Sequence, residues 1–461
     1  MKGFPGNFPT DNCDKNFKPW TELENGAWMI IKDGGANCSA RCFEGVRASS
    51  KVVVGEWLEP GYVDCEFLEA VCWENGGEEV YGYIHTQIKP NSTTPPPSLF
   101  PNPPNVFVFT IDSMSFGSAK RSLPKFLNYF QSEFQAVEFP FVNKVGENSK
   151  PNGIPLWFGK SISGGRKVNW EEIVPDWNRT EFCDRYLDNE THIFKQFKQH
   201  GYTTLQMEDW VETMIDSFPS CQGFYERPAD HIFRPFSAFR AKYGMNITRK
   251  HLNGKLCRQN HHAIMDLLQQ AITAYSDRPL FSWIWLIDIG HDYSNGPYRM
   301  DQYLIDYFEN NRQVFDDSFV FFVSDHGFRM GVMTEIGLFE RSNPYLAISI
   351  PKKYRDEKNG MLEMMRVNSR QLQTHFDTRA TMLDILMVPS LIEYGYSTLW
   401  NTYEIEVKTA EPSAVHFQTM VTYDPKTETM NFEKVVRLDK YGDTADCTAS
   451  VRLEPLCHCK K

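Results

Sequence analysis

Residues 106–112 read VFVFTID, and residues 319–327 read FVFFVSDHG. In each stretch a short apolar run rich in β-forming residues leads directly into acidic or imidazole side chains. Such uninterrupted runs are typical of parallel strands that are buried on both faces of a sheet. Active sites of open α/β sheets form at the carboxyl ends of the strands. We therefore expect Asp112, Asp325 and His326 to lie together at such an edge.

Further apolar runs and helical periods alternate along the chain. Strands are predicted at residues 51–54, 201–207, 280–287 and 345–350, and helices at 124–134, 261–275, 300–314 and from Asp377 to about 387. This alternation predicts an α/β fold with a mostly parallel sheet sandwiched by helices. Asp288 and His291 follow the strand at 280–287, so a third strand brings polar groups to the same edge. A single Asp after a strand is often only a turn former or a helix cap, which is the alternative explanation.

The stretch GENSKPNGIPLWFG, residues 146–159, is rich in Gly, Pro and Asn and contains Ser149. A serine in a tight loop that enters a helix exposes its hydroxyl, and nearby backbone N–H groups can receive an anion. A metal bound to that hydroxyl would lower its pKa and create a nucleophile. Asn152 would then donate a hydrogen bond to a substrate oxygen. A plain turn capped by Asn and Ser is the alternative.

The composition argues against a nucleic-acid-binding protein. The 461 residues carry a formal net charge of −11, and no long basic run interrupts the sequence. A surface that binds nucleic acid needs clustered Lys and Arg to neutralise phosphates. The hydrophobic share of 41% and the charged share of 23% are those of an ordinary globular protein.

Cysteines and glycosylation sequons indicate the secretory pathway, with an extracellular or luminal location. Of eleven cysteines, five lie in the first 72 residues and three in the last fifteen, which predicts disulfides that staple the two ends. Five Asn-x-Ser/Thr sequons support a glycoprotein, at Asn37, Asn91, Asn178, Asn189 and Asn246. The opening MKGFPGNFPT lacks the apolar run of a signal peptide, and no stretch is long enough to span a membrane. We expect a trimmed ectodomain or a missing leader, with membrane association only through a missing N-terminal anchor; a cytosolic protein is the alternative.

A proline-dense stretch, KPNSTTPPPSLFPNPPN at residues 89–105, suggests a domain boundary because it can form neither a helix nor a central strand. We predict a Cys-rich N-terminal module at 1–88 and a connector at 89–104. The α/β domain would then span 105–404. A β-rich extension that ends in a CxC pair would occupy 405–461.

The order of these motifs resembles the alkaline phosphatase/sulfatase superfamily. Asp112 is followed by NSKPN around Ser149, then by GHD at His291 and by SDHG at Asp325 and His326. More narrowly, the chain resembles the DUF229 family over roughly residues 104 to 400. The stretches that carry this likeness are VFTIDSMS, AVEFPFVNKVGENSKPNGIPLWFG, GYTTLQMEDW, VSDHGFRMG and THFDTRATMLDIL.

The resemblance implies an alkaline phosphatase-like fold and a role for each matched residue. Asp112, Asp325 and His326 would hold a metal together with Ser149, and Ser149 would be the nucleophile. Asn152 would contact the transferred group. His291 and His375 would bind a second metal or contact the substrate. Two-zinc relatives place an Asp four residues before the first His, where this chain has Ile287, so Asp288 is the candidate in its place. The metal would be zinc, as one or two ions, with Mn or Mg possible.

The nucleophile motif favours phosphate esters over sulfate esters as substrates. Sulfatases carry C/S-x-P-x-R, in which the first residue matures to formylglycine, whereas Ser149 is followed four residues later by Gly153. The predicted activity is therefore that of a metal-dependent hydrolase or phosphotransferase. No GxSxG elbow indicates an acyl hydrolase. The alternative is a non-catalytic secreted or cell-surface binding protein that retains the fold.

Overall fold

A computed structural model describes the greater part of the chain. The described residues are 10, 12–32, 35–90, 102–166, 172–329, 335–356 and 360–387, together with four strands between 401 and 437. The chain divides into two compact units, Met1–Leu383 and Asp384–Lys461. Within the described residues, no helix has both the length and the apolar character needed to cross a bilayer.

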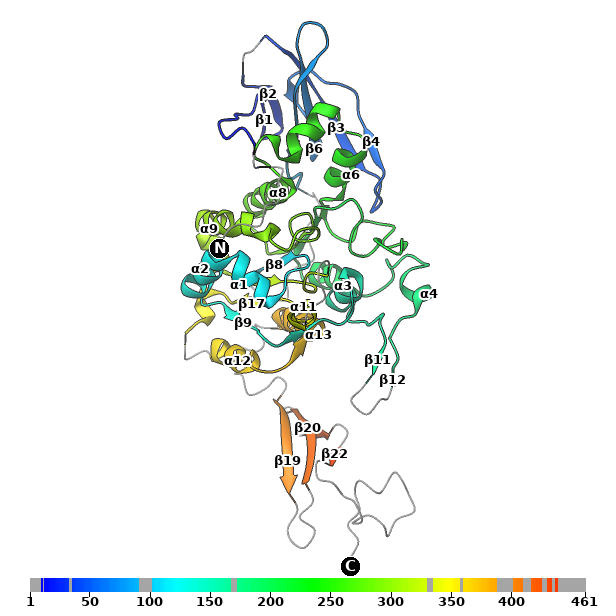
Figure 1. The fold of residues 1–461 in the computed structure, drawn as a ribbon, viewed down its shortest axis with the longest axis vertical. Helices are drawn as coiled ribbons and strands as arrows, with labels where there is room; N and C mark the ends of the chain where they lie inside the picture. Colours follow the sequence, from blue (N-terminus) through cyan, green and yellow to red (C-terminus); the bar gives the residue numbers. More distant parts are fainter. Residues whose placement is uncertain are drawn as a thin grey trace, which may run out of the picture. The chain divides into compact units, whose positions relative to one another are not determined.

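A seven-stranded mixed sheet forms the centre of the first unit (Figure 1). In spatial order its strands are β14 (His231–Ile232), β13 (Thr203–Glu208), β15 (Leu280–Leu286), β8 (Asn105–Ile111), β16 (Ser318–Val323), β17 (Leu346–Ser349) and β9 (Val137–Glu138). The first five run parallel, and β17 is antiparallel to both of its neighbours. The prediction of a mostly parallel α/β sheet is confirmed.

Side chains from the two faces of this sheet enter separate layers of helices. Phe107, Phe109 and Ile111 of β8 alternate with Val106 and Val108, as the two-residue period of a strand requires. On one face, rings of β8 and β16 pack against Phe126 of α2 and Phe308 of α9. On the other face, Trp283 of β15 packs against Trp157 of α3 and Phe194 of α5. Many of the aromatic side chains therefore belong to the hydrophobic core.

The helices of the first unit cover both faces and the edges of the central sheet. They are α1 (Phe116–Ser122), α2 (Pro124–Phe134), α3 (Ser149–Phe158), α4 (Arg179–Phe182), α5 (Ile193–Gln199), α6 (Arg234–Lys242), α7 (Asn246–Lys250), α8 (Asn260–Ala274), α9 (Asp301–Asn310), α10 (Arg312–Asp316), α11 (Glu335–Ser342), α12 (Met361–Asn368) and α13 (His375–Asp384). Short helical turns are η1 (His251–Lys255), η2 (Gly296–Met300), η3 (Lys352–Tyr354) and η4 (Ile385–Met387).

Two predicted helices differ from those observed. The helix expected at 300–314 is broken at Asn311, whose side-chain amide donates to the carbonyl of Tyr307 at 3.0 Å and ends α9. The helix expected to begin at Asp377 begins at His375. The Asp377 carboxylate reaches back to accept the backbone N–H of Thr374 at 2.7 Å, so it caps the helix from inside the first turn.

The N-terminal strands of the first unit form two small antiparallel sheets. One contains β4 (Val52–Val54), β3 (Asn37–Gly45), β6 (Phe67–Trp73) and β7 (Glu79–Thr86); the other contains β1 (Thr21–Glu24), β2 (Ala27–Ile30) and β5 (Gly61–Tyr62). The ring of Phe43 on β3 stacks on Phe239 of α6 at 3.7 Å between centroids. Phe43, Phe67 and Ile84 belong to the same hydrophobic cluster as β8. The core is therefore continuous between these strands and the central sheet.

Four disulfides join the described cysteines. Cys38–Cys72 joins β3 to β6, and Cys42–Cys65 joins β3 to the segment before β6, so disulfides among the N-terminal cysteines are present as predicted. Cys13 instead pairs with Cys257, and Cys183 pairs with Cys221 in the middle of the chain. Disulfide cross-links therefore extend into the α/β region, which the clustering of cysteines at the two ends did not indicate.

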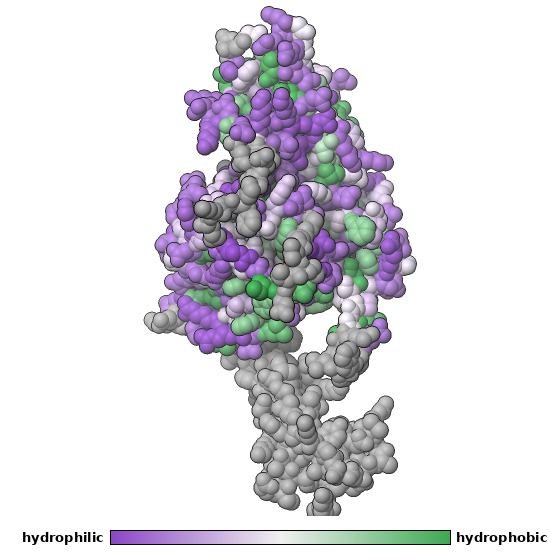
Figure 2. Space-filling view, in the orientation of Figure 1, coloured by the Kyte–Doolittle hydropathy of each residue, from purple (hydrophilic) through white to green (hydrophobic). Residues whose placement is uncertain are grey.

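Shorter strands and the second unit complete the fold. Within the first unit β10 (Val142–Asn143) pairs with β18 (Gln373–Thr374), and β11 (Gly165–Arg166) pairs with β12 (Glu172–Ile173). The second unit contains an antiparallel sheet of β19 (Asn401–Lys408), β20 (His416–Asp424), β21 (Thr429–Phe432) and β22 (Val436–Arg437). Most of the predicted connector at 89–104 and the terminal CxC pair lie outside the described residues. The face of the molecule in Figure 2 is largely hydrophilic where the N-terminal strands lie.

Candidate active site

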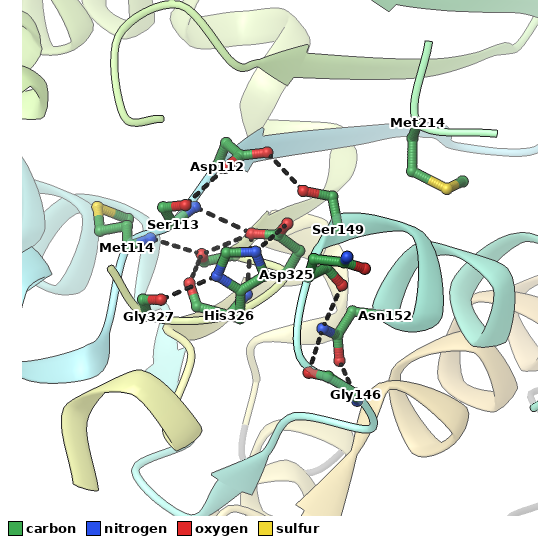
Figure 3. Close-up of polar contacts among 12 residues, drawn as sticks. Asp112, Ser113, Met114, Gly146, Ser149, Asn152, Met214, Asp325, His326 and Gly327 are labelled. Atoms are coloured by element: carbon green, nitrogen blue, oxygen red, sulfur yellow. Dashed lines mark hydrogen bonds and ion pairs between the residues drawn. The ribbon is translucent and has the colours of Figure 1, made fainter. Parts of the chain in front are cut away.

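The carboxyl ends of β8 and β16 place two acidic residues side by side. These strands are neighbouring and parallel, with Val323 opposite Thr110. Asp112 directly follows β8, and Asp325 lies two residues beyond β16. Ligand atoms of Asp112, Asp325 and His326 all lie within 4.8 Å of one another. The three side chains are at most 1% exposed. Their predicted convergence is present (Figure 3).

Ser149 joins this cluster from the first residue of α3. Its hydroxyl donates to Asp112 Oδ2 at 3.0 Å, and the side chain is partly exposed. The preceding Asn148 has extended backbone angles and makes no side-chain cap at the amino end of α3. The amino end of a helix favours negative charge. Ser149 therefore combines an oriented hydroxyl, solvent access and a position at the amino end of a helix.

The two ligand candidates from β16 are held in complementary orientations. Asp325 Oδ1 accepts the N–H groups of Ser113 at 3.0 Å and His326 at 2.8 Å. Its other oxygen, Oδ2, has no hydrogen-bond partner. His326 Nδ1 lies 2.8 Å from the carbonyl of Gly327, which can only accept, so the ring proton sits on Nδ1. His326 Nε2 is left with a free lone pair, 3.3 Å from Asp325 Oδ2.

The charges in the cluster call for a cation. Burial raises the pKa of Asp112, and the neighbouring Asp325 carboxylate raises it further. Two adjacent buried carboxylates repel each other unless positive charge is supplied. The atoms without partners are a carboxylate oxygen and an imidazole nitrogen, which are donors suited to a divalent metal. The fixed Nδ1 hydrogen bond is the usual support of a metal-binding histidine. The residues present therefore fit a metal ion.

Asn152 occupies a different position from the one expected of a substrate contact. Its Oδ1 accepts the N–H groups of Val145 at 2.7 Å and Gly146 at 3.1 Å. Both of its amide hydrogens are committed, to the carbonyls of Gly146 and Asn148, each at 2.8 Å. No donor remains for a substrate oxygen in this conformation. The amide instead shapes the loop that carries Ser149.

The residues proposed for a second metal do not converge in the structure. His375 is fully buried, and its Nε2 donates to the carbonyl of Asp325 at 2.6 Å, so it supports a residue of the first cluster. His291 is partly exposed and its Nδ1 contacts Asp292 at 2.7 Å. Asp288 accepts from the amide of Asn260 at 3.3 Å. None of the three joins Asp112, Asp325 and His326 in a metal-binding group among the described residues. Their role at a second metal stays a prediction.

Ser113 and Gly290 support the site but escaped the sequence interpretation. Ser113 donates its hydroxyl to Asp112 Oδ1 at 2.7 Å, from a left-handed backbone conformation with φ of 59°. Gly290 lies so close to Asp112 that a Cβ there would meet the Asp112 carbonyl at 2.0 Å. Lys150, adjacent to the nucleophile, points its ammonium away, to the carbonyl of Ser217 at 2.6 Å. The sequence gave no signal for the approach of Gly290 to Asp112 because the two residues come from different segments.

Comparisons with known proteins place the chain in a family and give distant structural likenesses. The C-terminal periplasmic domain of EcEptC from Escherichia coli matches at 12% identity, with 62% of this chain and 83% of that chain covered and a TM-score of 0.38. The lipoteichoic acid synthase LtaP from Listeria monocytogenes matches at 12% identity, covering 74% and 87%, with a TM-score of 0.40. A protein in the alkaline phosphatase superfamily from Vibrio parahaemolyticus matches at 14% identity, covering 77% and 88%, with a TM-score of 0.39.

Likeness at these scores carries no argument about chemistry. No curated protein matches the sequence. The family model described as "Protein of unknown function (DUF229)" matches residues 7–394, which is most of the chain and contains the whole Asp112 cluster. The chain is a member of the DUF229 family.

Proposed function

We propose that this protein is a metal-dependent hydrolase or transferase of phosphate esters that uses Ser149 as its nucleophile. The observation that carries the proposal is the set of buried, partnerless ligand atoms on Asp325 and His326 beside the Ser149 hydroxyl. The ion would be held by Asp112, Asp325, His326 and the Ser149 oxygen. Two carboxylates with one imidazole suit zinc, with Mn or Mg as alternatives.

A divalent cation at this position would lower the pKa of the serine hydroxyl and offset negative charge on a phosphoryl oxygen. The hydrogen bond to Asp112 fixes the direction of the Ser149 Oγ–H bond. Ser149 Oγ would release its proton to solvent and form a bond to phosphorus. The bond from phosphorus to the ester oxygen would break, and the departing alkoxide would take a proton from solvent. Water or a second alcohol would then attack phosphorus, break the Ser149–phosphorus bond and restore the hydroxyl.

Phosphate is favoured over sulfate by the position four residues after Ser149. Gly153 stands where the formylglycine motif has arginine, and the Met214 side chain packs against it, with Sδ 2.4 Å from the place that a Cβ would take. An unmodified serine is a suitable nucleophile for phosphorus. Sulfate esters remain the second choice of substrate.

An extracellular or luminal location is part of the proposal. The four disulfides are stable in an oxidising compartment. All four described sequon asparagines are exposed and so are accessible to glycosylation: Asn37, Asn178, Asn189 and Asn246.

Metal content and turnover of matched variants test the proposal together. Protein from a secretory host would be analysed by elemental mass spectrometry and assayed on p-nitrophenyl phosphate, its diester and an aryl sulfate. We expect about one equivalent of metal per chain in the wild type. Ser149→Ala should retain the metal and lose turnover, whereas Asp325→Ala should lose both. Asp306→Ala, an exposed acid on α9, serves as the control and should retain both.

Other outcomes separate the alternatives. Two equivalents of metal would restore Asp288, His291 and His375 as ligands of a second ion. Full turnover in Ser149→Ala would exclude this serine as the nucleophile. A wild-type protein that binds no metal after supplementation and turns over no ester would instead be the non-catalytic binding protein.

A further inference from the structure

A cavity of about 500 Å³ lies between the N-terminal strands and the central domain. Its walls come from β1, from the end of β7 and from one side of α8, and β7 contacts both of the others. Figure 1 shows β1 and α8 toward one end of the first unit. None of the Asp112, Ser149, Asp325 and His326 side chains lines it. Its size falls within the range of about 300–1,000 Å³ that is usual for small-molecule sites.

Hydrogen bonds across the cavity hold its walls in place. His85 Nε2 on β7 lies 2.7 Å from the hydroxyl of Thr21 on β1. On the opposite side, the Gln270 amide donates to the carbonyl of Thr86 at 2.8 Å, and the Thr86 hydroxyl donates back at 3.2 Å. All four residues line the cavity. The site is therefore built before any ligand arrives, which reduces the entropy cost of binding.

The charge of the lining is nearly balanced. Arg258 and Asp266 form an ion pair with each other. Burial lowers the pKa of His85 to about 3, so this imidazole is neutral at physiological pH. Glu22, exposed at the mouth, is the one remaining charged group among the lining residues. A phosphate, sulfate or other anionic ligand would meet no unpaired cation here.

Polar groups that lack partners remain in this neutral wall. Asn260, at the start of α8, is 3% exposed, and its side-chain carbonyl has no hydrogen-bond partner. This oxygen is itself sealed from solvent, so the accessible polar groups of the wall are those of its neighbours. The amide of Gln269 lines the same wall and makes no side-chain hydrogen bond within the described part of the chain. Leu23, Ile31 and Tyr83 provide apolar surface alongside.

We propose that this cavity is a binding site for an uncharged carbohydrate, separate from the serine site. Sugar rings present hydroxyl donors for the Glu22 carboxylate and hydroxyl acceptors for the Gln269 amide, both of which line the cavity. Their C–H faces pack on aromatic and aliphatic side chains such as Tyr83 and Ile31. Because Asn260 also donates to Asp288, three residues before His291, the site adjoins the loop that follows β15.

Binding of neutral oligosaccharides tests the proposal. The full chain, after enzymatic removal of any N-glycans, would be titrated with maltotriose, cellotriose and triacetylchitotriose. Saturation-transfer NMR and calorimetry would report binding. We expect saturable binding of at least one trisaccharide, weakened about tenfold or more in the double variant Glu22→Ala/Gln269→Ala. Both substitutions lie on accessible side chains, so the fold should remain. Gln131→Ala, an exposed glutamine on α2, is the control.

Three results would overturn the proposal. One is the absence of saturable binding for all three sugars. Another is equal affinity in the wild type and the double variant, which would place the sugar elsewhere. The third is tighter binding of a sulfated trisaccharide than of its neutral parent, lost in the double variant, which would make the ligand an anion. Ser149→Ala should bind the neutral sugar like the wild type, so failure here is distinguishable from failure of the proposed esterase activity.

Discussion

Single atoms decide what the serine site can do. The Asn152 side chain makes four hydrogen bonds to the backbone of residues 145–148, immediately before Ser149. Those bonds fix the path of the chain into α3 and so the position of the Ser149 hydroxyl. We regard Asn152 as a positioning residue because its amide is fully committed to the loop.

Replacement of Asn152 should therefore lower kcat more than it changes KM or metal content. For Asn152→Ala we expect kcat to fall about 10–100-fold, since a displacement of about 1 Å at a nucleophile costs that much. Asn152→Asp keeps the hydrogen-bond acceptor and loses the donors, so its kcat should lie between those of the wild type and Asn152→Ala. Steady-state kinetics and elemental analysis are the measurements, with Asn310→Ala on the exposed end of α9 as the control. An unchanged kcat would contradict this role.

The close approach of Gly290 to Asp112 gives a second prediction at the scale of one residue. A methyl group at position 290 would overlap the Asp112 carbonyl oxygen, so the loop after β15 must move. We expect Gly290→Ala to lower the free energy of unfolding by about 1–3 kcal/mol and to weaken metal binding. Chemical denaturation and metal titration would measure both effects. In the control, Gly165→Ala, the new methyl group meets its nearest atom at 3.7 Å, so stability should be unchanged.

At the scale of elements, the central strands and their polar ends could be predicted from sequence. Buried parallel strands have continuous apolar runs, and the runs at β8, β15 and β16 are short and rich in β-forming residues, which favours strands over helices. The hydrogen-bond partners of Asp288 and His375 could not be predicted, because those partners come from other elements. Asn260 of α8 binds Asp288, and the Asp325 carbonyl occupies His375 Nε2. Short β-type runs were predicted in the N-terminal region, but only the one at 51–54 was located, since the alternating pattern of the others is short and interrupted by turns.

Helix α5 begins at a histidine, which makes its stability dependent on pH. His192 Nδ1 accepts the N–H of Lys195 at 3.3 Å, so the cap requires the neutral ring. Burial, followed by the charge of Lys195, lowers the pKa of His192 to about 4. The unfolded chain therefore binds this proton more readily than the folded chain. The stabilising contribution is complete above about pH 6.5 and is lost as the pH falls toward 4.

The variant His192→Asn should remove this dependence while keeping a cap, because Asn is a favoured N-cap residue. Its unfolding free energy relative to wild type should rise by about 2–3 kcal/mol between pH 7 and pH 4. Denaturant titrations of both proteins across that range measure the difference. Parallel pH profiles for the two proteins would mean that His192 is protonated in the folded state.

At the scale of the whole molecule, the Cys13–Cys257 disulfide spans 244 residues and ties the beginning of the chain to the segment before α8. Cross-links that close long loops restrict the unfolded chain most. The double variant Cys13→Ser/Cys257→Ser should therefore lose about 2–5 kcal/mol of stability. The matched variant Cys42→Ser/Cys65→Ser opens a loop of only 23 residues and should lose less. Denaturation of both variants gives the comparison, and the reverse order would contradict it.

The stacking of Phe43 on Phe239 also affects how the chain folds while it is being synthesised. The N-terminal strands leave the ribosome first, yet the ring that covers Phe43 belongs to α6, almost two hundred residues later. Until α6 emerges, aromatic surface on β3 and β6 stays uncovered, and Cys13 waits still longer for Cys257. Nascent chains in that condition are prone to aggregation and to wrong cysteine pairing. The growing chain is thus exposed to both errors for the interval between those two residues.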